Sequence, residues 1–151
     1  MRFIHIGEYL DRKVKILKIK ESSDIKRFSL NDSVLLLFFS VKLLSKKELN
    51  NTLEKIISLN PLAIEVAGYN ASKAFDLLLK KLSNRTTPHH IMTSVTNSTN
   101  IPTILDDLLF ATWPTEESFD VWKNYSIIFL GKNNEYIRFE KEVKKFFKNH
   151  Q

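Results

Sequence analysis

The sequence has no cysteine, only three glycines and no apolar run long enough to cross a membrane. Without cysteine there is no disulfide, thiol nucleophile, zinc–thiolate site or iron–sulfur cluster. No G-x-G-x-x-G or G-x-x-x-x-G-K-[ST] loop occurs, so the usual Rossmann and P-loop nucleotide sites are not expected. The longest largely apolar run, residues 34–41, is far shorter than the roughly 20 residues that span a bilayer. The N-terminus does not have the pattern of a signal peptide, so we expect a cytoplasmic protein with no membrane contact.

Histidine is also scarce, with four residues in the chain. His89 and His90 are adjacent and would point to opposite sides of an extended chain, so they make a poor metal pair. No H-E-x-x-H or H-x-E motif occurs, and there is no G-x-S-x-G nucleophile elbow. We therefore expect no metal and no cofactor, assign no catalytic residue, and favour a protein that is not an enzyme.

The net charge of +6 is concentrated at the two ends of the chain. Residues 1–30 hold eight basic and four acidic residues, residues 140–151 hold four and two, and the remainder balances to zero. Basic ends of this kind could attract nucleic acid or an acidic protein, or could be an ordinary solvated surface. Two acidic pairs, Asp106-Asp107 and Glu116-Glu117, are expected at solvated positions.

From residue 34 onward the chain repeats one pattern four times, a short apolar run followed by a helical pattern. The four runs are residues 34–41, 62–67, 90–95 and 125–130. Ser45 and Glu48 are spaced as a capping box at the start of the first helix, and Asn100 is the expected cap of the third. Alternating strands and helices predict an α/β fold. We expect a doubly wound, mostly parallel four-stranded sheet of the flavodoxin-like or Rossmann-like type.

Residues 1–33 do not fit the repeat and are interpreted as a basic N-terminal extension of a single domain spanning residues 1–151. Within it, residues 13–20 alternate between lysine and apolar side chains. Lysines along a strand commonly protect an exposed sheet edge, so we expect this segment to add an edge strand to the core formed by residues 34–151. A basic amphipathic segment on the surface is the alternative.

The carboxyl ends of the predicted strands are the natural place for a ligand in an open parallel sheet. Hydroxyl, amide, glycine and lysine residues gather there. The candidate ligand-binding residues are Ser40, Gly68, Tyr69, Asn70, Thr93, Ser94, Asn97 and Lys132. Such side chains can bind a phosphate or a base at helix N-termini. The same residue types also serve as caps and turn formers, which is the structural alternative.

The segment between the third helix and the last strand, residues 113–122, carries two tryptophans and a phenylalanine around a polar tip. Tryptophan is enriched at the energetic centres of protein interfaces. Trp113 and Trp122 are therefore the candidate partner-binding residues. The alternative is that both tryptophans anchor the ends of this loop in the core.

The order of these features resembles a family of small, uncharacterised bacterial α/β proteins. The matching positions are the apolar first strand (34–39), Gly68 with Asp76, Met92-Thr93-Ser94, and residues 108–114. The third strand of that family resembles M-T-T-W-H, whereas this chain has Val95-Thr96 in place of Trp-His. The resemblance extends over residues 33–131 and implies the fold, and it implies no activity.

Three functions remain open at this stage. The leading hypothesis is a non-enzymatic module that acts by protein–protein contact in a bacterial cytoplasm, for example an immunity-type or defence-associated protein. The alternative is a nucleotide or nucleic-acid binder that uses the strand ends and the basic termini. An enzyme of unusual type, using Thr93, Ser94 or Asp76, is the third.

Overall fold

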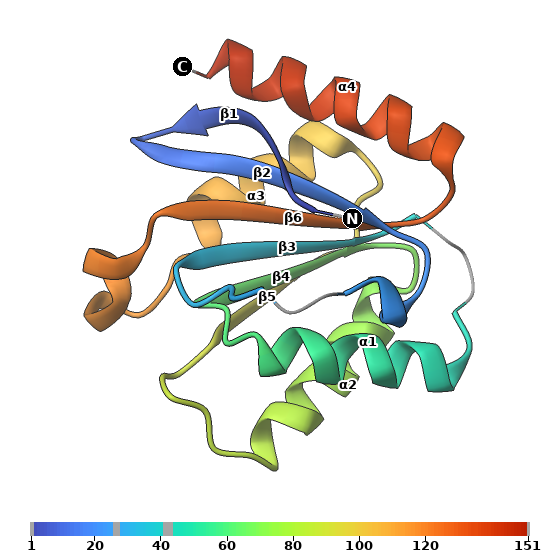
Figure 1. Cartoon of the computed structure of the whole chain (residues 1–151), viewed down its shortest axis with the longest axis vertical. Coiled ribbons are helices and arrows are strands. Elements are labelled where there is room, and N and C mark those ends of the chain that lie inside the picture. The colour runs from blue at the N-terminus through green and yellow to red at the C-terminus, as the bar shows by residue number, and fades with distance from the viewer. Residues whose placement is uncertain (1, 26–27, 41–43, 151) are drawn as a thin grey trace.

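The computed structural model describes residues 2–25, 28–40 and 44–150, and these form one six-stranded sheet with helices packed against it (Figure 1). The strands are β1 (Ile4–Tyr9), β2 (Arg12–Ile19), β3 (Ser33–Phe39), β4 (Ala63–Gly68), β5 (Met92–Thr96) and β6 (Asn124–Leu130). The α-helices are α1 (Lys46–Ser58), α2 (Ala71–Ser83), α3 (Ile101–Ala111) and α4 (Asn133–Asn149), and two short 3-10 helices are η1 (Ser22–Asp24) and η2 (Glu116–Val121). The four predicted strand–helix units are confirmed.

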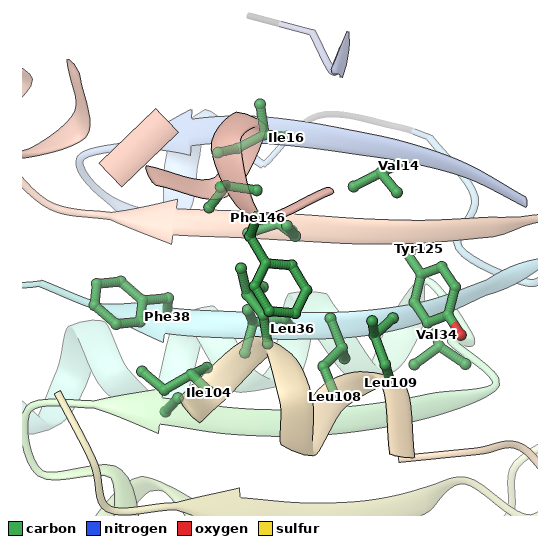
Figure 2. Close-up of a cluster of buried hydrophobic side chains, with 14 of the residues drawn as sticks. Val14, Ile16, Val34, Leu36, Phe38, Ile104, Leu108, Leu109, Tyr125 and Phe146 are labelled. Carbon is green, nitrogen blue, oxygen red and sulfur yellow. The ribbon is translucent and has the colours of Figure 1, made fainter. Parts of the chain in front are cut away.

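The sheet is mostly parallel and covered on both faces. Alternate residues of β3 point to opposite sides, and Val34, Leu36 and Phe38 join the cluster formed with α3 and α4. Figure 2 shows these side chains meeting Ile104 of α3 and Phe146 of α4. The intervening β3 residues pack into a second cluster with α1 and α2. A strand that is buried on both sides is mostly apolar, which explains the unbroken apolar run of residues 34–39.

The expectation of four strands with one added edge strand is wrong in two respects. The strand order is β1-β2-β6-β3-β4-β5, so the sheet has six strands. β2, the lysine-rich segment, is not the edge, because it pairs with β6 in parallel and with β1 in antiparallel orientation. The hydrophobic residues Val14 and Ile16 of β2 pack in the α3–α4 cluster, while Leu17 and Ile19 pack on the opposite side. The apolar residues of this strand, rather than its lysines, therefore determine its place inside the sheet.

The strand order creates one point at which the chain reverses direction across the sheet. The chain moves from β3 to β4 and then to β5, and afterwards returns to place β6 on the other side of β3. The helices that follow β3 and β6 therefore lie on opposite faces of the sheet (Figure 1). In doubly wound sheets such a switch point opens a crevice at the carboxyl ends of the two strands.

The predicted caps are formed at α3 and partly formed at α1. The Asn100 side chain accepts a hydrogen bond from the backbone N–H of Thr103, as predicted. The Ser45 hydroxyl accepts one from the Glu48 N–H, but the Glu48 carboxylate accepts hydrogen bonds from the N–H and hydroxyl of Ser22. The capping-box prediction is thus half correct. Its glutamate instead ties η1 of the N-terminal extension to α1.

Candidate functional site

A crevice of about 530 Å³ lies at the switch point between β3 and β6. Ser40 follows β3, Tyr69 follows β4, and Glu135 and Arg138 come from the first two turns of α4. The Ser40 hydroxyl donates a hydrogen bond to the Glu135 carboxylate. The crevice is lined by buried phenylalanine rings and by acidic and basic side chains. This arrangement can hold a small polar molecule, although Ser40 already has a partner within the chain.

The candidate ligand residues from the sequence do not all meet at this crevice. Ser40 and Tyr69 line it. Lys132 lies in a separate depression beside Lys20, and Asn97 accepts a hydrogen bond from the Ser72 hydroxyl at the start of α2. Glu135 and Arg138 also line the crevice, and the sequence analysis did not propose them. Their position at the start of the helix that follows the last strand could have indicated them.

The turn between β4 and α2 has a structural explanation. Gly68 has φ +95°, and a Cβ atom at this position would lie 2.2 Å from the Phe39 carbonyl oxygen. Only glycine tolerates both the conformation and this close approach. Asn70 follows in the left-handed region with φ 54° and precedes the first residue of α2. These two residues shape the turn, and a binding role for them stays a prediction.

A second cluster of chemically distinctive residues is buried between β4, β5 and α3. Glu65, in the middle of β4, has no exposed surface. Its Oε1 lies within hydrogen-bonding distance of the hydroxyls of Ser94 (3.3 Å), Thr96 (3.3 Å) and Thr112 (3.1 Å). The Ser94 and Thr112 hydroxyls are also 2.6 Å apart, so one of these two donates to the other and only one donates to Glu65. The Thr96 hydroxyl also lies 2.8 Å from the carboxylate of Asp107. Asp107 was expected at a solvated position, but α3 turns it towards the sheet. Thr93, the neighbour of Ser94, is partly buried.

The environment of Glu65 favours its protonated form. Burial, together with the hydrogen bond and negative charge of Asp107, raises the pKa of Glu65 to about 9. The three hydroxyls approach Oε1, while Oε2 is buried without a hydrogen-bond partner. Protonation turns this buried charge into a neutral carboxyl group. The cluster holds the end of α3, because Thr112 directly follows that helix.

The segment after α3 carries aromatic rings that contact one another in a row from the surface into the core. Trp113 is 48% exposed and its ring contacts Phe119, which is 40% exposed. Phe119 contacts Trp122, and Trp122 contacts the buried ring of Tyr125. Trp122 is only 6% exposed, and the guanidinium of Arg12 lies 3.6 Å above its ring. The two predicted contact residues thus differ, because Trp113 reaches solvent and Trp122 is a core anchor that cannot touch a partner in this conformation.

Three acidic residues lie close in sequence to the exposed rings of Trp113 and Phe119. Glu116, Glu117 and Asp120 are exposed, and residues 113–121 contain no lysine or arginine. Val121 adds a further exposed apolar side chain. We call residues 113–121 the aromatic–acidic surface. It carries three negative charges on a chain whose net charge is +6.

The backbone of the aromatic–acidic surface is held in place at both ends. The Trp113 indole N–H donates a hydrogen bond of 2.7 Å to the carbonyl of Leu109 in α3. At the other end, the Trp122 indole N–H donates to the carbonyl of Asn124 in β6. The exposed ring of Trp113 is therefore held before any partner arrives, and Phe119 packs between the two tryptophan rings, which lowers the entropy lost on binding.

Within the part of the chain that the structure describes, no three acidic or histidine side chains are grouped so that they could hold a metal ion. Among these same residues, none of the helices is both long enough and apolar enough to cross a bilayer. The chain matches no known protein family, and no curated protein or solved structure shows significant similarity to it.

Proposed function

We propose that the protein is a binding module that docks a protein partner on the aromatic–acidic surface. The observation that carries this proposal is the pair of exposed rings of Trp113 and Phe119, held rigidly on a buried aromatic anchor. Exposed, rigid aromatic side chains are the usual centres of binding energy in protein interfaces. A role as an immunity-type or defence-associated protein would need such a surface and stays a prediction.

The acids around these rings indicate the chemistry of the partner. Glu116, Glu117 and Asp120 flank the rings, and no cation neutralises them within residues 113–121. The complementary partner presents an apolar side chain to the rings, with lysine or arginine side chains around it. Arginine also stacks favourably on aromatic rings, as Arg12 does on Trp122 in this chain.

The size of the expected effect follows from the exposed area. The exposed half of an indole is on the order of 100 Å², which is worth about 2.5 kcal/mol on complete burial. Alanine at a central aromatic position typically costs about 2–4 kcal/mol in binding free energy. We therefore expect Trp113→Ala to weaken the complex by about 30-fold or more.

The test is capture of the partner from the native host followed by native mass spectrometry, with two variants in parallel. Ile137→Ala is the matched control, because Ile137 is a 67% exposed apolar residue on α4, outside the aromatic–acidic surface. The proposal predicts a stoichiometric partner that is lost with Trp113→Ala and retained with Ile137→Ala. A partner that binds both variants equally would show that the complex forms elsewhere.

The charges provide a second readout on the same complex. Replacing Glu116, Glu117 and Asp120 together with their amides should slow association and reduce its dependence on salt, because charges at the rim of an interface act mainly on the encounter rate. The dissociation rate should change little. A triple variant with unchanged association kinetics would mean that the acidic residues do not face the partner.

A further inference from the structure

The helices α1 and α2 lie on the same face of the sheet (Figure 1). Their side chains enclose a groove of about 640 Å³. One wall is formed by Lys46, Asn50 and Glu54 of α1. The other wall includes Lys80 and Lys81 of α2 and Arg85 just beyond it. This groove shares no residue with the aromatic–acidic surface or with the crevice at the switch point.

The groove carries a local excess of positive charge. Its lining has four cations and one carboxylate, a balance of +3. The net charge of residues 31–139, which include the whole groove, is zero. The positive charge of the groove is therefore a local excess, which acidic residues in other parts of this segment offset. Among the ion pairs of the described residues, none involves Lys46 or Lys80. Two of the four cations are therefore left for an external anion.

The single carboxylate arranges the other two cations. Glu54 accepts hydrogen bonds from the Lys81 ammonium at 2.8 Å and from the Arg85 guanidinium. These two bonds lower the pKa of Glu54, so its carboxylate stays ionised and keeps both cations in position. One guanidinium has five N–H donors in a planar fork. Arg85 thus retains donors for a second, anionic partner.

Helix electrostatics account for only part of this charge. Lysines in the last turn of a helix stabilise its negative end, which explains Lys80 and Lys81 at the end of α2. Lys46 is the first residue of α1, where the helix end is positive and a cation is unfavourable. Helix stability therefore does not explain a lysine at position 46, whereas binding of an anion in the groove would.

We infer that the groove between α1 and α2 binds the phosphate backbone of a nucleic acid without reading its bases. Its lining contains lysine, arginine, asparagine and threonine and no aromatic ring on which a base could stack. From Lys46 to Glu54 the helix rises by about 12 Å, so the groove is long enough to follow more than one phosphate of a strand.

The test measures binding of a fluorescent 12-nucleotide single strand by anisotropy at several salt concentrations. The variant Lys46→Gln/Lys80→Gln removes the two unpaired cations. Each lost phosphate contact should reduce the log–log salt slope by about 0.7, which at 0.1 M salt corresponds to about fivefold in affinity. We expect the double variant to bind about 25-fold more weakly, with a slope smaller by about 1.4.

Two further variants separate the groove from the overall charge. Lys141→Gln/Lys145→Gln removes the same charge from exposed positions on α4 and should leave binding unchanged. Glu54→Gln keeps a side-chain oxygen that accepts from Lys81 and Arg85, removes the only negative charge of the lining, and should tighten binding. Circular dichroism would verify that each variant is folded.

Three results would overturn the inference. Equal weakening by both lysine pairs would show that only net charge matters. A Glu54→Gln variant that binds no more tightly than the original would show that the anion does not enter this groove. Displacement of the strand by polyglutamate at equal charge concentration would show that the groove selects carboxylates as readily as phosphates.

Discussion

Replacing Glu65 with glutamine is expected to make the protein more stable, and increasingly so as the pH rises. The protonated carboxyl of Glu65 has three hydroxyls within hydrogen-bonding distance of one oxygen and interacts with Asp107. A glutamine side chain has the same shape, with a carbonyl to accept those bonds and an amide to donate towards Asp107. Unlike glutamate, it does not ionise when the chain unfolds.

The magnitude follows from the difference in pKa between the folded and unfolded chains. The pKa of Glu65 is about 9 in the folded protein, against 4.5 in the unfolded chain. Below the unfolded value both states are protonated, so the stabilising contribution of the proton is complete. As the pH rises towards 9, the unfolded chain releases this proton first, and stability falls by about 1.4 kcal/mol per pH unit. From pH 5 to pH 8 the loss is about 4 kcal/mol.

Urea unfolding at pH 5, 6, 7 and 8 provides the assay for the original protein and for Glu65→Gln. The difference between the two free energies of unfolding removes the contribution of all other titrating groups. It should widen by about 4 kcal/mol over this range in favour of the glutamine variant. Parallel curves would show that Glu65 is ionised in the folded protein. Glu54→Gln is the control, because hydrogen bonds from Lys81 and Arg85 lower the pKa of Glu54 and its charge stabilises the fold above about pH 4.5. This variant should be less stable than the original protein, by the same amount at each pH from 5 to 8.

Three other substitutions test how the surrounding structure is held, each by urea unfolding at neutral pH. Gly68→Ala should destabilise the fold by about 2 kcal/mol or more, because φ +95° and the Phe39 carbonyl both oppose a Cβ atom; a neutral effect would contradict the geometry of this turn. Ser45→Ala should cost about 1 kcal/mol through loss of the α1 cap. Trp122→Ala should cost about 3–5 kcal/mol, against about 1 kcal/mol for Trp113→Ala, because only Trp122 is fully packed; equal losses would place both rings in the core.

The sequence predicted the repeating core well because its signals are local. Continuous apolar runs mark strands that are buried on both faces, and the Ser45 and Asn100 caps mark where α1 and α3 begin. The N-terminal extension was harder, because a strand's neighbours in a sheet are set by long-range packing. The lysines of residues 13–20 indicated an edge, but the apolar residues between them place this strand between β1 and β6.

The candidate sites were predictable only in part, for the same reason. The exposed ring of Trp113 and the buried ring of Trp122 are nine residues apart and look alike in sequence. The Glu65 cluster left one visible signal, a glutamate in the middle of the apolar run 62–67, but its partners come from β5 and from the C-terminal half of α3 with the residue after it. The groove between α1 and α2 had no local signal, since Lys46 is more than 30 residues away from Lys80 and Lys81 in the sequence.

The most direct test of the binding surface is the accessibility of Trp113 in the complex. Trp122→Phe leaves Trp113 as the only tryptophan, and acrylamide should quench its fluorescence readily in the free protein, because the ring is 48% exposed. Addition of the captured partner should shift this emission to the blue and protect it from acrylamide. If the partner binds stoichiometrically while Trp113 remains equally quenchable, the aromatic–acidic surface is not the docking site.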